Sequence, residues 1–166
     1  NKHRTAQELP AAPPFRAESP VLGSVLETRH AFDIVRSRVT YIIHEDGGDI
    51  VEASTDDDGG TIAIMATVFD GTIFSRPTIN VDGDTGTILY GAFKASDGSI
   101  HVRRRLARSD TLETAVQVGS ATFEDDSFHF VRALEGPGRW ILVARESGGN
   151  IVEYYSSDDG ETWELL

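Results

Sequence analysis

The feature that most limits the possible folds is an internal repeat with a period near fifty residues. Residues 41–62 align without a gap on residues 142–163, and 10 of these 22 positions are identical. The identical positions are Glu45, Gly47, Gly48, Ile50, Val51, Glu52, Asp57, Asp58, Gly59 and Thr61, each with its counterpart 101 positions later. Between the two segments, Ile100 lies 50 residues after Ile50 and 51 before Ile151. This spacing indicates three similar supersecondary units in tandem.

Each unit is predicted to contain four short strands, with a glycine-containing hairpin turn between the second and the third. The expected strands are 32–35, 39–44, 49–54 and 61–68, then 78–81, 87–93, 99–106 and 114–118, then 128–133, 139–145, 150–155 and 162–165. Four-stranded units with this period are typical of propeller blades. The prediction is therefore an all-β β-propeller, or partial propeller, of about three four-stranded antiparallel blades over residues 24–166.

A turn motif closes the third unit. Ser156, Asp158, Gly160, Thr162 and Trp163 have the spacing Ser-x-Asp-x-Gly-x-Thr-Trp. A hydroxyl and a carboxylate two residues apart can accept backbone N–H bonds within a tight turn. Glycine permits a left-handed backbone, and the Thr-Trp pair suits the start of a strand with an inward indole. We expect Asp158 to accept hydrogen bonds within its own loop and Trp163 to be largely buried.

The first unit carries a degenerate copy of this motif at Thr55, Asp57, Gly59 and Thr61. The middle unit keeps only a polar turn over 105–110. The motif resembles the Asp-box, or BNR repeat, of sialidase-like β-propellers. In that family the box links two strands of a blade and lies away from the active site, so the resemblance implies a structural role for these residues.

Catalytic residues of the same family are harder to place. The resemblance implies an arginine triad, a Tyr–Glu nucleophile pair, an acidic residue and an Arg-Ile-Pro signature. The nearest fragments, 15–17 and 75–77, do not match the signature. Glu153 with Tyr154 or Tyr155 resembles the nucleophile pair, yet Glu153 is the repeat counterpart of Glu52, which indicates a role in the blade.

These observations predict a non-catalytic recognition or structural module that binds glycan or protein. The alternative is a fragment of a sialidase-like glycoside hydrolase. Three blades leave sheet faces uncovered, so we expect another copy or other protein subunits to complete the propeller. The resemblance implies settings such as a viral tail fibre or a cell-surface assembly, and we expect an extracellular or virion-surface location.

Charge and composition exclude several classes of binding partner. The net charge is −12, which makes nucleic acid and anionic lipid poor partners. The chain has no cysteine, and its longest apolar run, 61–69, is too short to insert into a membrane. Residues 1–23 contain four of the six prolines and little apolar content, so we expect an extended N-terminal arm or linker.

Two further segments are candidate ligand sites. Arg103 and Arg105 project from one face of the strand 99–106, either as an anion or acidic-glycan site or as solvated charges. The loops 82–86 and 56–59 place carboxylates at alternate positions, as calcium loops do, but such residues are also common in ordinary turns. We therefore expect no cofactor and no metal, with Ca²⁺ as the alternative.

Overall fold

The computed structural model describes residues 25–33, 38–45, 49–55, 63–71, 74–107 and 111–166. They form three four-stranded sheets, which we call blades 1, 2 and 3. Blade 1 contains β1 (Val25–Asp33), β2 (Arg38–Glu45), β3 (Ile50–Thr55) and β4 (Ala63–Phe69). Blade 2 contains β5 (Phe74–Val81), β6 (Ile88–Lys94), β7 (Ser99–Arg105) and β8 (Val116–Gln117). Blade 3 contains β9 (Phe123–Arg132), β10 (Trp140–Glu146), β11 (Ile151–Ser156) and β12 (Glu164–Leu165).

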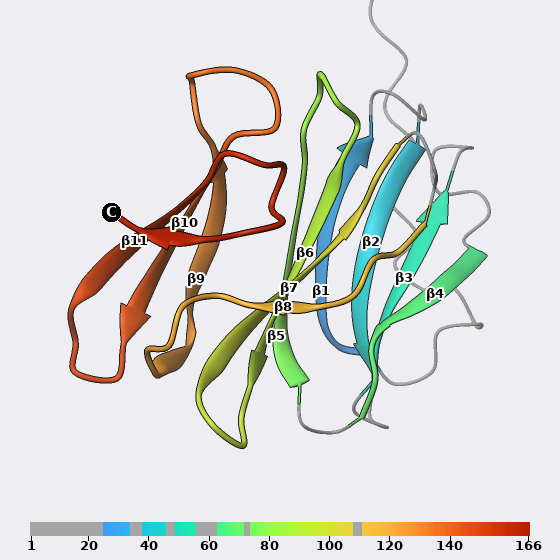
Figure 1. Ribbon diagram of the computed structural model, residues 1–166. Helices are drawn as coiled ribbons and strands as arrows, with labels where there is room; N and C mark the ends of the chain where they lie inside the picture. Colours follow the sequence, from blue (N-terminus) through green and yellow to red (C-terminus); the bar gives the residue numbers. More distant parts are fainter. Residues whose placement is uncertain (1–24, 34–37, 46–48, 56–62, 72–73, 108–110) are drawn as a thin grey trace, which may run out of the picture.

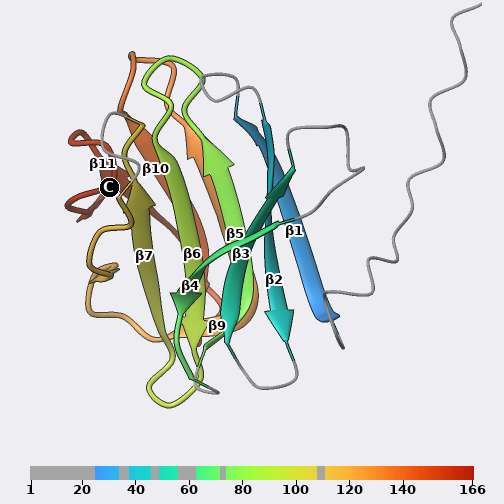
Figure 2. The same cartoon turned by 90° about the vertical axis from the view of Figure 1, so that its right-hand side faces the viewer.

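Every blade is an antiparallel meander in which each strand pairs with its neighbour in sequence. Blade 2 lies between the other two (Figure 1), and its first strand, β5, contacts both β1 and β9. In Figure 2, strands β1–β3 and β5–β7 stand beside one another. No helix occurs in the described residues, including any that could span a membrane. The predicted fold class is confirmed: the chain is a partial β-propeller of three blades.

In the described residues, two hydrophobic core layers lie on the two faces of blade 2. Ile88, Tyr90 and Ala92 pack toward blade 1, where Ile50 and Val68 meet them. The alternate residues of blade 2 pack toward blade 3 in a larger cluster: Leu89, Phe93, Ile100 and Val102 meet Phe128, Phe130, Trp140, Leu142 and Tyr154. Burial on both faces explains why β6 is almost continuously apolar instead of alternating.

Gly91 marks the closest approach of blades 2 and 3. A Cβ atom built there would lie 2.8 Å from Phe128 Cε2, 2.8 Å from Thr78 Cγ2 and 2.9 Å from Phe130 Cε2. Real side chains do not tolerate such distances, so the missing side chain in the middle of β6 makes room for two aromatic rings of β9.

Strand β1 differs most from its prediction of 32–35, because it begins at Val25 and ends at Asp33. Strand β9 also begins early, at Phe123 instead of residue 128. Its first residues, Phe123 to Asp126, include three acidic positions and resemble a loop in sequence. The backbone nevertheless continues the sheet, because Phe123 pairs with Glu146 of β10 and a bulge between Ala144 and Glu146 absorbs the change in register. Phe123 N also donates to Gly98 O, in the β6–β7 turn of blade 2, at 2.7 Å.

Several predictions fall outside the described residues. The arm 1–23 and Asp57, Gly59 and Thr61 of the degenerate motif are among them, as is the acidic loop 56–59. Thr55, the remaining member of that motif, is the last residue of β3 and is buried.

Candidate functional site

The loop from Ser156 to Trp163 joins β11 to β12 and is closed by its own aspartate. Asp158 Oδ1 accepts hydrogen bonds from Ser156 Oγ at 2.8 Å, Glu161 N at 3.0 Å and Thr162 N at 2.9 Å. Asp158 Oδ2 accepts from Thr162 Oγ1 at 2.5 Å. Burial opposes the ionised carboxyl, but these donors outweigh it and lower the pKa of Asp158.

Two features of this loop require glycine at position 160: the backbone conformation and the close approach of blade 2. The φ of Gly160, +87°, lies in the left-handed region, and an added Cβ would sit 2.6 Å from Leu89 Cδ2 of blade 2. Its N–H donates to Ser156 Oγ at 2.9 Å. The loop of blade 3 is therefore fitted tightly against blade 2.

The two tryptophans of blade 3 are buried to different degrees. Trp163 is only half-buried; its ring packs on the core and lies 5.9 Å from the Phe130 ring. Trp163 packs inward as expected but is less completely enclosed than Trp140, because β12 is a two-residue edge strand with Leu165 62% exposed. Trp140, which no motif singled out, is completely buried, and its Nε1 donates to Asp159 Oδ1 at 3.4 Å.

We expect replacing Asp158 by Ala to lower the free energy of unfolding at pH 7 by about 1–3 kcal/mol, because four donors lose their acceptor. A carboxyl whose pKa is lower in the folded state than its ordinary 3.8 stabilises the fold above that value. This stabilisation is lost as the pH falls through the folded-state pKa. Urea unfolding at pH 7, 4 and 3 should therefore show a smaller acid-induced loss in the variant than in the parent.

The exposed Asp70 provides the control for this measurement. Asp70→Ala should change the unfolding free energy by less than about 0.5 kcal/mol at pH 7. Equal acid-induced losses in Asp158→Ala and the parent would show that the carboxylate does not stabilise the loop.

Asp82, the first carboxylate of the loop 82–86, for which Ca²⁺ binding was the alternative, is fully buried and bonded to the protein. Its Oδ1 accepts from Asp84 N at 2.8 Å and Thr85 N at 3.3 Å, and its Oδ2 accepts from Gly138 N of blade 3 at 2.7 Å. Burial opposes its charge, yet these N–H groups and nearby Arg132 lower the pKa of Asp82. Within the described residues, no group of three or more His, Cys, Asp or Glu side chains is placed to hold a metal ion.

The arginine row of β7 divides between two interfaces. Arg105 pairs with the fully buried Glu52 of blade 1, and its Nε lies 3.4 Å from Tyr90 Oη. Arg103 Nη1 donates to Val68 O, also of blade 1, at 2.5 Å. The guanidinium groups proposed as an anion site thus join blades 1 and 2. Burial, followed by the charge of Glu52, raises the pKa of Tyr90.

Arg104 projects from the opposite face of β7, toward blade 3. It pairs through Nε with Glu113 and through Nη2 with Glu161 at 2.9 Å, and its Nη1 donates to Asp158 O at 3.0 Å. Burial opposes its charge, but the two carboxylates raise the pKa of Arg104. These contacts tie the loop of blade 3 to blade 2.

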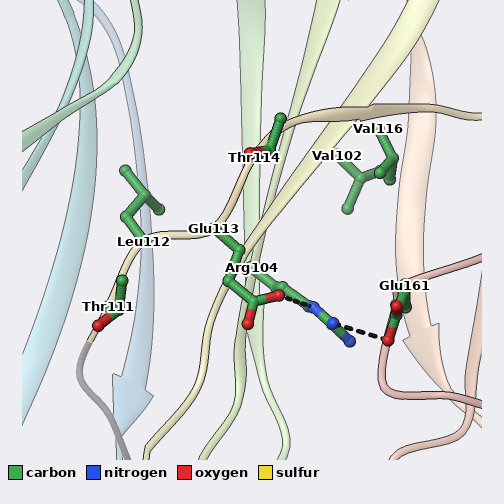
Figure 3. Close-up of a pocket in the computed structure, with 9 residues that line it drawn as sticks. Val102, Arg104, Thr111, Leu112, Glu113, Thr114, Val116 and Glu161 are labelled. Atoms are coloured by element: carbon green, nitrogen blue, oxygen red, sulfur yellow. Dashed lines mark hydrogen bonds and ion pairs between the residues drawn. The ribbon is translucent and has the colours of Figure 1, made fainter.

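A cavity of about 480 Å³, which we call the Arg104 cleft, opens beside this ion-pair group (Figure 3). Its lining includes Arg104, Thr111, Leu112, Glu113, Thr114 and Glu161. A second hollow, of about 360 Å³, is also lined by Arg104, together with Thr87, Asp158 and Asp159. The sequence signal for this site was the strand alternation that separates Arg104 from Arg103 and Arg105, but two of the partners of Arg104, Asp158 and Glu161, come from another blade.

The Glu153–Tyr155 pair lies elsewhere, on the face of blade 3 that points away from blade 2. Tyr155 Oη accepts from Arg139 Nη1 at 2.6 Å and donates to Glu135 Oε2 at 3.1 Å. Glu153 is exposed, and no described side chain pairs with its carboxylate. The structure does not bring this pair into the Arg104 cleft.

Comparison with known proteins adds to the fold. No protein-family model and no curated protein sequence matches the chain. Among solved structures, a β-1,3-galactosidase of glycoside hydrolase family GH43 matches with a TM-score of 0.58 and 14% sequence identity. The match covers 86% of this chain and 32% of the galactosidase chain, so this chain spans about a third of that protein's length. The galactosidase is a propeller of a different superfamily from the sialidases, and the Asp-box resemblance stays a prediction.

Proposed function

We propose that the chain is a non-catalytic recognition module that binds a glycan in the Arg104 cleft and belongs to a larger assembly. One observation carries this proposal: the cleft combines charged and hydroxyl groups with apolar side chains. Arg104 and Glu161 supply a donor and an acceptor, Thr111 and Thr114 supply hydroxyls, and Leu112 supplies an apolar surface. Sugars present the same combination of hydroxyl groups and C–H faces, and ligand sites typically have this mixed lining.

The arrangement of carboxylates favours binding over hydrolysis. Glycosidases need two carboxyl groups roughly 5–10 Å apart, with the scissile bond between them. Here the space between Glu113 and Glu161 is occupied by the guanidinium of Arg104, which is ion-paired with both (Figure 3). A glycosidic bond would have to displace a side chain that also joins two blades.

The second candidate is a fragment of a sialidase-like glycoside hydrolase. The GH43 neighbour is named as a galactosidase, which favours this class of function, although 14% identity supports the fold alone. In this reading, Glu113 and Glu161 would act after Arg104 moves aside.

Binding to an array of defined oligosaccharides, including β-1,3-galactosides and sialosides, tests the proposal. We expect at least one glycan to bind, and Glu161→Gln and Thr114→Val to weaken that binding by at least about tenfold in calorimetry. Asp97→Asn, at the β6–β7 hairpin, is the control and should bind as the parent does. Absence of binding to every glycan would contradict the proposal.

The same protein samples should not hydrolyse fluorogenic β-galactosides or sialosides. Turnover that Glu113→Gln or Glu161→Gln abolishes would replace the proposal by the hydrolase alternative.

A further inference from the structure

We propose that the outer face of blade 3 is a docking surface for a further propeller blade that carries an arginine at the end of its third strand. The inference rests on the proposed role in a larger assembly and names the surface and the chemistry of the partner. By outer face we mean the side chains that point away from blade 2: Val131, Ile141, Val143, Ile151, Glu153 and Tyr155. Ile151 is 65% exposed and Val131 is 49% exposed.

The outer face of blade 3 corresponds residue by residue to the face of blade 1 that meets blade 2. His44 pairs with Ile50 across β2 and β3, and Arg145 pairs with Ile151 across β10 and β11. The β2–β3 pair and the β10–β11 pair therefore have the same register, related by the 101-residue offset of the sequence repeat. Ile151 occupies the place of Ile50, and Glu153 occupies the place of Glu52.

In blade 1, these two positions are covered. Ile50 and Glu52 are both completely buried. Ile50 lies in the cluster formed with Ile88 and Tyr90 of blade 2, and Glu52 pairs with Arg105. Blade 3 thus displays in water the same isoleucine and glutamate that blade 1 buries beneath an arginine-bearing blade.

A second copy of this chain does not supply such a blade. The last residues of the three third strands are Thr55, Arg105 and Ser156, so only blade 2 has the cation. Arg105 is itself already buried against blade 1. On blade 1, Val51, Ala53 and Thr55 are also buried. The complementary partner is therefore a blade outside these three, with an apolar face and an arginine positioned like Arg105.

A fusion supplies a blade of this chemistry in the test. A second copy of residues 70–118 is appended after Leu166 of the full chain, which places a blade-2 sequence next to blade 3. The chain has no cysteine, so Ile151→Cys gives one reporter thiol. We expect the appended blade to slow labelling of this thiol by at least about tenfold, because reaction then requires local opening. Gln117→Cys on the original blade 2 is the accessible control and should label equally fast in both proteins.

The expected ion pair between Glu153 and the appended arginine is tested by the labelling rate of variants that lack one partner. In the fusion, Glu153→Gln should restore fast labelling, and so should replacement by Gln of the appended arginine that corresponds to Arg105. Asp70→Asn removes one exposed charge elsewhere and should leave the protection intact. Glu153 is exposed, so its replacement should not affect folding of the unfused chain.

Two outcomes would overturn the inference. One is labelling in the fusion as fast as in the unfused chain. The other is a dimer of the unfused chain that Glu153→Lys disrupts, which would assign the face to a second copy. Glycan binding in the Arg104 cleft is measured separately on the unfused chain, so failure of docking and failure of the proposed binding function are distinguishable.

Discussion

Replacing Arg105 by Ala should lower the free energy of unfolding by about 3–5 kcal/mol, because it leaves a buried carboxylate without its partner. Glu52 is completely inaccessible, and Arg105 supplies its counter-charge across the interface of blades 1 and 2. Urea denaturation at neutral pH measures the change. Lys94→Ala, which removes the exposed pair between Lys94 and Asp97, should cost no more than about 1 kcal/mol.

A double replacement separates the cost of the unpaired charge from the value of the pair. Glu52→Leu combined with Arg105→Met should be much more stable than Arg105→Ala, since apolar residues of similar volume often substitute for a buried ion pair without loss. If Arg105→Ala costs no more than Lys94→Ala, the pair does not hold the two blades together.

Trp140→Ala should cost about 3–5 kcal/mol, and Trp163→Ala distinctly less. Trp140 is fully buried in the larger core layer, whereas Trp163 is half-buried beside a short edge strand. The chain has two tryptophans, so the fluorescence of each variant reports unfolding through the remaining one. Equal costs, or a larger cost for Trp163, would contradict the burial described here.

The blade pattern could be predicted from the sequence because its determinants are local. Glycine turns such as Asp97-Gly98 set the hairpins, and the offset between Ile50 and Ile151 reproduces the register observed in the sheets. The confirmed fold class follows from these short-range signals together with the period of the repeat. The start of β9 could not be predicted, because its acidic residues have low strand propensity. Pairing with β10 overrides this local propensity.

The candidate site could not be predicted in the same way, because it depends on which face of a strand meets which blade. Arg103 and Arg105 attracted attention as a charge cluster, yet they reach acceptors of blade 1 that are far away in sequence. Only the alternation of side chains along the strand distinguished Arg104 from Arg103 and Arg105. The partner of Arg104, Glu161, lies 57 residues later in the sequence. Contacts between blades leave no periodic signal in one sequence.

The meander order of the sheets has a consequence for how the chain acquires its structure. All hydrogen-bonded pairs among the strands that the structure describes join consecutive strands, from β1 with β2 to β11 with β12. Short loops therefore close first, and the entropy lost in bringing distant segments together is postponed to the docking of preformed sheets. Such a chain suits vectorial folding on the ribosome, because the β1–β4 meander can pair completely before β9 has been synthesised.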